Sequence, residues 1–551
     1  MRARLAHLPF ALLPFVLLPF VLVPFVGGCS REEATQAAAD VSDVSDVSDA
    51  NDDVAVDAPS PFKRGPYGTT PRSVAGPFVA PTTAGDWSFE EKFDGEDHYV
   101  FVAYQSTNAY SKSLFKPLSL QKLLAQSPKN MHWFFLYRDD RATFDAFVAA
   151  AAPILDEHWA ARVHFVTTRA DELEGWLGDV FRERTKAKLP YERYDRIHFG
   201  VDRTQHVREV GMLGRLGGSA GITPDLSFAA QEPLYWEFER AREAKLASVK
   251  ATIVPMMRDE VVVEDVYKEV ELPDEATMAT FDTLEVDLTM NCVNHRDGEC
   301  GAWDYISDLR LCGDAPSDGG KPACDVELAR WITTYWREGR WVTDISGMLA
   351  FLKGGGRKTL RWYASKQWDP RPANYVASLS LRLSNTGKGM RPVSAVRLFE
   401  GGALNDKYGA AHPPVKVDVP TGTKKAELYA LITGHGSETD QCAEFCNHTH
   451  HFTLNGGTRR SLEFPMAKSN DGCRKRVEEG VVPNQHGTWY FGRGGWCPGL
   501  DVRPFLADVT KDAVLGGDNT FSYEALIGTS APAAGSAYGN VHMNAYLVLW
   551  R

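Results

Sequence analysis

Cysteine is absent from residues 61–290, although the 551-residue chain contains nine cysteines. Cys29 precedes this stretch, and the other eight cysteines follow it. A segment without thiols cannot carry out thiol–disulfide exchange, whatever its fold. The contrast therefore excludes thiol redox chemistry from this stretch and predicts a domain boundary near the point where the cysteines begin.

Basic residues are also fewer than acidic residues. The chain has 60 Lys and Arg against 72 Asp and Glu, which gives a formal net charge of −12. A general nucleic-acid-binding protein needs a positive surface field, so we expect no nucleic-acid partner. Hydrophobic residues make up 44% of the chain and charged residues 24%, a composition typical of a folded globular protein. At about 100–200 residues per domain, the length predicts two to four domains.

A long apolar run occurs near the start of the chain, at residues 8–26, and prolines recur through it. Two arginines precede this run, and the sequence Gly-Gly-Cys29 follows it. A charged start, an apolar stretch and small residues indicate a secretory signal, and the cysteine after Gly-Gly resembles a bacterial lipoprotein box. The prolines disfavour the alternative, a membrane-spanning anchor. We therefore expect removal of residues 1–28, lipidation of Cys29, and an exported lipoprotein held by its lipid at the outer membrane or cell surface of a bacterium.

The rest of the chain divides by composition and periodicity. Residues 29–60 are small, acidic and free of aromatic side chains, which predicts a disordered linker. Residues 85–250 alternate strand-like and helix-like patterns, which predicts an α/β module with parallel strands. Residues 255–390 and 391–551 show period-two alternation between Gly, Pro and Asp turns, which predicts tandem all-β jelly-roll sandwiches. The predicted fold class is thus multidomain, an α/β module followed by two jelly rolls.

The predicted elements of the α/β module are short and follow one another in a regular order. Strands are predicted at 98–104, 131–137, 162–167 and 196–201, and helices at 118–124, 144–159, 171–184 and 234–249. This order, with the sequence FGVDRTQHVREVG near its end, resembles a thioredoxin-like fold. The position of that family's CxxC motif reads Ser-Thr-Asn-Ala here, at 106–109, so we expect a structural or docking module. In the jelly rolls, strands are predicted at 261–266, 284–288, 379–383, 429–432, 452–454 and 546–549.

The eight later cysteines are an even number in a chain predicted to be exported, which predicts four disulfides. They are Cys292, Cys300, Cys312, Cys324, Cys442, Cys446, Cys473 and Cys497. A zinc cluster is the alternative, but the spacing is irregular and contains no paired CxxC motif.

Three islands of sequence place cysteines beside carboxylates, aromatic side chains or arginine. They are NCVNHRDGECGAWDYISDLRLC (291–312), GHGSETDQCAEFCNHTHHFTLNG (434–456) and GTWYFGRGGWCPG (487–499). Rigidly held acids beside exposed aromatic side chains suit amide or glycoside hydrolysis, in which one carboxylate activates water and another manages protons. The alternative is a set of cross-linked loops without chemistry.

These islands resemble those of the peptide-N-glycosidase F family, bacterial amidases that remove whole glycans from asparagine. The resemblance runs from about residue 281 to the C-terminus and includes, in the family's order, WITTYW (331–336), CAEFC (442–446), RGGWCPG (493–499) and TFSYE (520–524). It implies two adjacent jelly rolls with an active site at their interface. It also implies the disulfides Cys292–Cys300, Cys442–Cys446 and Cys473–Cys497, which leaves Cys312 and Cys324 as the fourth pair.

The resemblance implies roles for particular residues. Asp304 matches the principal catalytic aspartate, and Glu444 matches the glutamate that organises the site water. The implied substrate-binding residues are Trp303, Trp368, Arg493, Trp496 and His435. The implied reaction is attack of water on the asparagine side-chain amide of an N-linked glycoprotein or glycopeptide. It yields aspartate and a glycosylamine, with no cofactor required, and we expect the protein to act as a monomer.

Two positions depart from the family's pattern. A third acid of the family is replaced by Lys366, or by Ser365 if the alignment slips, and His435 stands in place of a pocket tryptophan. A cation near Asp304 and Glu444 would hold both acids ionised and weaken proton transfer. A catalytically degenerate protein that binds glycans or glycopeptides is therefore an alternative function.

The sequence HTHH (448–451) suggests a copper-binding alternative. His448 and His450 lie on one face if this segment is a strand, and Met543 could add a thioether ligand. The pattern resembles one copper site of the peptidylglycine and dopamine monooxygenases, which share the paired jelly-roll architecture. Their second copper site needs three histidines in the first jelly roll, where this chain offers His295. The alternative is thus a copper-binding oxidoreductase-like site at His448, His450 and Met543.

Overall fold

The computed structural model describes residues 61–108, 110–186, 197–213, 222–316, 319–364, 374–436, 438 and 440–551. The predicted signal, the lipidation site at Cys29 and the acidic linker lie outside the described residues. The chain divides into two units, Met1–Ala58 and Pro59–Arg551. In the second unit, none of the described helices has the length and apolar character needed to cross a membrane.

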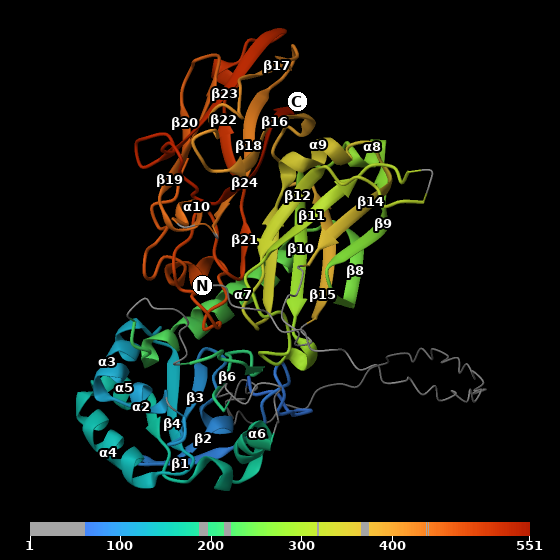
Figure 1. Cartoon of the computed structure of the whole chain (residues 1–551). Coiled ribbons are helices and arrows are strands. Elements are labelled where there is room, and N and C mark those ends of the chain that lie inside the picture. Colours follow the sequence, from blue (N-terminus) through green and yellow to red (C-terminus); the bar gives the residue numbers. More distant parts are fainter. Residues whose placement is uncertain are drawn as a thin grey trace, which may run out of the picture. The chain divides into compact units, whose positions relative to one another are not determined.

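A five-stranded sheet forms the centre of the α/β module (Figure 1). In spatial order its strands are β5 (Val163–Phe165), β4 (Met131–Tyr137), β3 (His98–Tyr104), β6 (Phe199–Val201) and β7 (Val207–Arg208). The first three run parallel, whereas β6 is antiparallel to β3 and β7 is antiparallel to β6. This confirms the predicted α/β layer and gives it a thioredoxin-like strand order.

Helices of 4 to 18 residues accompany these strands along the chain. They are α1 (Phe89–Lys92), α2 (Ser111–Leu114), α3 (Pro117–Gln126), α4 (Arg141–Ala151), α5 (Glu157–Ala160), α6 (Gly175–Lys186) and α7 (Gln231–Ser248), and a hairpin of β1 (Val79–Thr82) and β2 (Gly85–Ser88) precedes β3. The single helix predicted at 144–159 is wrong. Pro153 cannot donate a backbone hydrogen bond, and the Asp156 side chain caps a new helix by accepting from the Trp159 amide.

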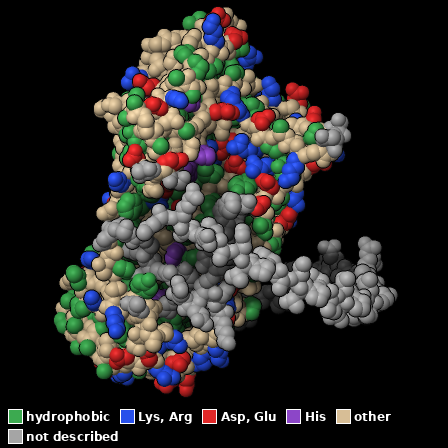
Figure 2. All heavy atoms as spheres, in the orientation of Figure 1, with side chains coloured by type: hydrophobic (Ala, Val, Ile, Leu, Met, Phe, Trp, Pro, Cys, Tyr) green, Lys and Arg blue, Asp and Glu red, His purple; other side chains and the backbone are tan. Residues whose placement is uncertain are grey.

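The first β-sandwich is built from two antiparallel sheets (Figure 1). One sheet has the order β13 (Gly339–Asp344), β10 (Thr283–Asn291), β15 (Tyr375–Ser384) and β8 (Thr252–Val262). The other has the order β21 (Leu500–Val502), β12 (Val326–Ile332), β11 (Ile306–Cys312), β14 (Gly355–Tyr363) and β9 (Asp265–Asp274). Two short helices occur in the connections between the strands of this sandwich along the sequence, α8 (Glu275–Met278) and α9 (Leu349–Leu352). Figure 2 shows Lys and Arg side chains gathered over part of this sandwich, interspersed with Asp and Glu.

The strand predicted at 261–266 is wrong, because the chain turns within this segment and passes from one sheet of the sandwich to the other. β8 ends at Val262, β9 begins at Asp265, and Glu264 adopts a positive φ of 69° at the turn. A positive φ favours glycine or asparagine, and the sequence offers neither here. The apolar alternation therefore continues across the turn and conceals it.

The second β-sandwich also pairs two antiparallel sheets, each with four strands among the described residues. One has the order β16 (Pro392–Ala403), β24 (Asn540–Trp550), β18 (Lys425–His435) and β22 (Phe505–Asp508). The other has the order β17 (Val415–Val419), β23 (Gly517–Ile527), β19 (His448–Leu454) and β20 (Arg460–Glu463). Buried side chains of both sheets, such as Leu428 and Phe452, share one core. The tandem sandwiches predicted from the period-two pattern are thus confirmed.

The strand β21 links the two sandwiches. It comes directly after the RGGWCPG sequence, within the residues predicted for the second jelly roll, yet it pairs with β12 of the first sandwich. Trp331 of β12 lies opposite Asp501 of β21. This pairing carries the third cysteine island to the strand that bears the WITTYW sequence.

The structure contains four disulfides, and they are the four predicted pairs. The bonds join Cys292 to Cys300, Cys312 to Cys324, Cys442 to Cys446 and Cys473 to Cys497. All four lie in the β-sandwich half of the chain, as the distribution of cysteines requires.

Candidate active site

Asp304 lies in a loop between the Cys292–Cys300 disulfide and β11. The Thr333 hydroxyl, just past the end of β12, donates to the Trp303 carbonyl at 2.5 Å and accepts from the Tyr305 amide at 2.8 Å. These bonds flank Asp304 on both sides and fix its backbone. The carboxyl keeps some access to solvent, with 16% of the side chain exposed.

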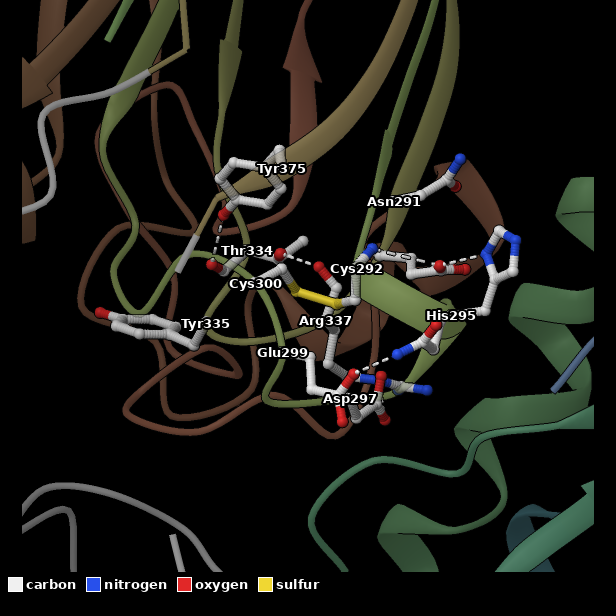
Figure 3. The surroundings of a disulfide bond; sticks show 12 residues. Asn291, Cys292, His295, Asp297, Glu299, Cys300, Thr334, Tyr335, Arg337 and Tyr375 are labelled. Carbon is white, nitrogen blue, oxygen red and sulfur yellow. Dashed lines mark hydrogen bonds and ion pairs between the residues drawn. A yellow bond between two sulfur atoms is a disulfide. The ribbon is translucent and has the colours of Figure 1, made fainter. Parts of the chain in front are cut away.

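The Cys292–Cys300 disulfide closes a loop that packs against residues 334–337 (Figure 3). The Trp336 amide donates to the Gly301 carbonyl at 2.7 Å, and the Gly298 amide donates to the Trp336 carbonyl at 2.6 Å. Gly301 permits this close packing, because a Cβ atom there would lie 2.3 Å from the Tyr375 hydroxyl oxygen. The cross-linked loop and the WITTYW segment therefore form one packed unit next to Asp304.

Glu444 lies on α10 (Cys442–Phe445), a single helical turn whose ends are joined by the Cys442–Cys446 disulfide. The turn begins after Gln441, which adopts a left-handed conformation with φ 48°. The Glu444 carboxylate accepts a hydrogen bond from the Gly436 amide at 3.1 Å. The disulfide and the short helix leave the Glu444 backbone little freedom, as expected for a tight cross-linked loop.

Arg493 brings the two acids together. Its Nε lies 3.0 Å from a carboxylate oxygen of Glu444, and its Nη2 lies 3.9 Å from a carboxylate oxygen of Asp304. The guanidinium also donates to the Phe491 carbonyl at 3.0 Å and to the Thr488 hydroxyl at 2.8 Å. With 1% of its side chain exposed, Arg493 is a fixed cation that faces carboxylates from two different cysteine islands.

Burial shifts the pKa of both carboxyls upward. Loss of solvent is the largest cause for Glu444, and it raises the pKa to about 7 even though Arg493 and the Gly436 amide favour the ionised form. Burial also raises the pKa of Asp304, against the opposing effects of Arg493 and of a hydrogen bond from Tyr335. The negative charge of Asp304 makes a smaller contribution to the rise at Glu444.

Tyr335 is a site residue without an assigned role in the sequence analysis, although it lies within the quoted WITTYW sequence. Its hydroxyl hydrogen-bonds Asp304, and its ring lies edge-on to Trp303. Its backbone amide donates at 2.8 Å to the side chain of Gln485, which is fully buried and also donates to the Pro498 carbonyl. Burial raises the pKa of Tyr335 well above its usual range, so the phenol remains a hydrogen-bond donor.

Arg337, two residues further on, ties this segment to the α/β module. Its guanidinium lies 2.7 Å from Glu232 on α7. It also lies 3.0 Å from Asp297, within the Cys292–Cys300 loop (Figure 3). It also donates to the Pro483 carbonyl at 2.5 Å. Because Arg337 is 5% exposed, these are buried contacts. No local pattern marks Arg337 or Glu232, since their pairing depends on residues more than 100 positions apart.

Aromatic side chains flank the two acids. Trp303 is 44% exposed, an unusual value for a tryptophan in this chain, and it adjoins Asp304. His435 stacks on Trp496 with ring centroids 4.8 Å apart, and the Trp496 indole donates to the Gly434 carbonyl at 2.7 Å. Arg493 lies 5.1 Å from the Trp496 ring centroid, so this pair is continuous with the charged centre. Trp368, Lys366 and Ser365 lie outside the described residues.

The predicted copper ligands lie inside the second sandwich. His448 and His450 share one face of β19, as predicted, and both are fully buried. Their rings bond each other at 2.7 Å, and their remaining ring nitrogens bond the Ala443 carbonyl and the Tyr523 hydroxyl. A copper ion would have to break these bonds, so the histidines as placed do not fit one. Among the residues that the structure describes, no group of three or more His, Cys, Asp and Glu is arranged to hold a metal ion.

Comparisons with known proteins find similarities in the C-terminal half of the chain. Residues 403–548 match a family model described as Peptide-N-glycosidase F, C terminal. The peptide-N(4)-(N-acetyl-beta-D-glucosaminyl)asparagine amidase F of Elizabethkingia miricola is 25% identical over 267 residues, which are 45% of this chain and 68% of that protein. A crystal structure of a peptide-N(4)-(N-acetyl-beta-D-glucosaminyl) asparagine amidase aligns with a TM-score of 0.42 and 16% identity, over 55% of this chain and 96% of the other. The structure of PNGase F, a glycosylasparaginase from Flavobacterium meningosepticum, aligns with a TM-score of 0.40 and 16% identity, over 54% of this chain and 96% of the other.

Proposed function

We propose that this chain, whose C-terminal half is related to the peptide-N-glycosidase F family, hydrolyses the amide bond that joins an N-linked glycan to asparagine. The observation that carries the proposal is the approach of Asp304 and Glu444 to the single buried guanidinium of Arg493. Two acids with raised pKa values beside one fixed cation form an arrangement suited to proton transfer near neutral pH. The substrate is an N-linked glycoprotein or glycopeptide.

In this mechanism Asp304 is the base and Glu444 is the acid. Water attacks the carbonyl carbon of the asparagine side chain while its proton passes to the ionised Asp304. The protonated form of Glu444 gives its proton to the amide nitrogen as the carbon–nitrogen bond breaks. The products are aspartate and a glycosylamine, which then loses ammonia to water. Because the pKa of Glu444 is about 7, the rate falls as the pH rises above 7 and this acid loses its proton.

The other site residues position these groups. Arg493 stabilises the negative charge of the pair, and its fixed contacts require no reorganisation during the reaction. The Tyr335 hydroxyl orients Asp304 by its hydrogen bond. The exposed ring of Trp303 offers a flat apolar surface on which a sugar could stack.

The test is incubation of the purified protein with a denatured N-glycoprotein. We expect released glycan and conversion of the glycosylated asparagine to aspartate, read by mass spectrometry of the peptides, and loss of both products in Asp304→Asn. Intact glycopeptides after incubation with the wild-type protein contradict the proposal. If those glycopeptides nevertheless bind, and Trp303→Ala abolishes the binding, the degenerate glycan-binding function replaces the enzymatic one.

We further propose that the protein is exported and anchored through a lipid on Cys29. The Gly-Gly-Cys29 sequence supports this location, and so do the four disulfides, because disulfides persist in oxidising compartments. The expected result is incorporation of a labelled fatty acid into the wild-type chain in a bacterial host. A Cys29→Ser variant that takes up the same label contradicts the proposed anchor.

A further inference from the structure

A line of buried polar side chains runs from the Glu444 turn into the core of the second sandwich. His448 bonds the Ala443 carbonyl through Nε2 at 2.7 Å and bonds His450 through Nδ1 at 2.7 Å. The other nitrogen of His450 lies 2.6 Å from the Tyr523 hydroxyl, which lies 3.1 Å from the Tyr408 hydroxyl. All four side chains are buried, the least so being Tyr523 at 7% exposure.

The chemistry of the partners gives this line a single direction. A carbonyl oxygen only accepts, so Nε2 of His448 carries a proton and donates to Ala443. Burial lowers the pKa of His448 to about 4, so the ring is neutral and its Nδ1 must accept. His450 therefore donates from Nε2, and its Nδ1 accepts from the Tyr523 hydroxyl. Tyr523 in turn accepts from Tyr408.

The line ends on the backbone next to Glu444. Ala443 belongs to the last turn of α10, where carbonyls lack a donor within the helix, and His448 supplies one. The neighbouring Glu444 carbonyl accepts from the Gly494 amide at 2.7 Å. These two bonds hold consecutive carbonyls of the turn that carries the acid.

Two glycines make room for this arrangement. A Cβ atom on Gly434 would lie 1.9 Å from the Ala443 carbonyl oxygen and 2.6 Å from Nε2 of His448. A Cβ atom on Gly494 would lie 2.4 Å and 2.5 Å from the same two atoms. The bond between His448 and Ala443 is therefore closely packed against the backbone of both glycines, and a side chain at either position would displace it.

We propose that His448, His450, Tyr523 and Tyr408 are positioning residues that hold the Glu444 carboxyl in its place beside Arg493 through a one-directional hydrogen-bond relay. The His-Thr-His sequence at 448–450 places both histidines where this relay needs them, because alternate residues of a strand share a face. The inference rests on the proposed function for its effect on catalysis, but the relay itself is a property of the fold.

The kinetic test compares two amide substitutions of His448 that differ in reach. In His448→Gln the amide nitrogen can take the place of Nε2 and still donate to Ala443, whereas in His448→Asn the amide is too short. We expect His448→Asn to lower kcat by about 10-fold to 100-fold, the usual cost of a misplaced catalytic group, with KM unchanged, and His448→Gln to restore most of kcat. The control is His451→Gln on the opposite face of β19, which should match the wild type. Equal kcat values for both His448 variants, with both folded by thermal melting, contradict the proposal.

The second test needs no enzymatic activity and therefore separates this inference from the proposed function. Nitrogen-15 NMR of histidine-labelled protein should show His448 and His450 as neutral rings protonated at Nε2. It should also show a change of the His450 signals, and not of the His451 signals, in Tyr523→Phe. A ring protonated at Nδ1 in either residue contradicts the relay even if the protein is an active amidase. If both rings are protonated at Nε2 but the protein has no amidase activity, the relay is supported and the proposed function is contradicted.

Discussion

The two acidic loops of the site are held in place by different means. The Asp304 loop depends on contacts from distant parts of the chain, through Thr333 and Tyr335 and, behind Tyr335, Gln485. The Glu444 turn depends on its own neighbourhood, the Cys442–Cys446 bond and the His448 side chain. The comparison shows that one acid is positioned mainly by distant contacts, whereas the other lies on a locally closed turn whose contacts extend to Gly494 and, through His450, to Tyr523. Arg493 is the point at which the two meet.

Substitution of Arg493 removes the feature that the two loops share, and so has the largest expected effect. Arg493→Met leaves both carboxyls without a cation, which raises both pKa values further and leaves Asp304 protonated over more of the pH range. We expect kcat to fall by about 1000-fold, the loss typical for removal of a fixed electrostatic group. Steady-state kinetics across pH measure this effect. A variant that keeps wild-type kcat and pH dependence contradicts the shared role of Arg493.

Breaking one loop's support at a time sharpens the comparison. Arg337→Met removes the cation that pairs with the buried carboxylates of Glu232 and Asp297, and we expect it to lower the free energy of unfolding by about 3–5 kcal/mol. The double substitution Cys442→Ser and Cys446→Ser removes a disulfide between cysteines four positions apart. We expect it to lower the free energy of unfolding by about 2 kcal/mol, because the unfolded chain gains entropy. Denaturant unfolding measures both. A larger loss from the cysteine pair than from Arg337→Met contradicts the division into long-range and local support.

Glu444→Gln tests the local turn through the pH dependence of stability. Between pH 4.5 and about 7 the folded chain holds a proton on Glu444 that the unfolded chain has lost, so this group lowers stability as the pH rises. A pKa rise from 4.5 to about 7 corresponds to about 3 kcal/mol. We expect the melting temperature of Glu444→Gln to exceed that of the wild type at pH 8 and to match it near pH 4. The exposed Glu463→Gln serves as control, and a variant less stable than wild type at pH 8 contradicts the pKa assignment.

Local patterns predicted the elements whose signals are local. The strands at 98–104 and 131–137 match β3 and β4 to the residue, because each is a buried run of aromatic and apolar side chains. The helix predicted at 144–159 spans a break at Pro153, and the strand predicted at 261–266 spans the turn at Glu264 between the two sheets of the first sandwich. The turn is hidden by apolar residues that do not all face the core, because Val262 is buried but Val261 and Val263 are exposed.

The candidate site could be predicted as far as the resemblance of its motifs extends. Asp304, Glu444 and Arg493 come from three separate sequences, and the structure places them together. Tyr335 and Arg337 were not assigned roles, because their partners belong to segments that meet them only in the folded chain. The relay from His448 was interpreted as a metal site, since spacing on a strand does not distinguish two ligands from two hydrogen-bonded rings.

The most direct test of the central claim is deglycosylation in water enriched in oxygen-18. If Asp304 and Glu444 act together on water at the asparagine amide, the released peptide carries aspartate with one oxygen-18 atom, and Asp304→Asn yields no such peptide. Glycan release that leaves asparagine intact, or aspartate without the label, contradicts the account.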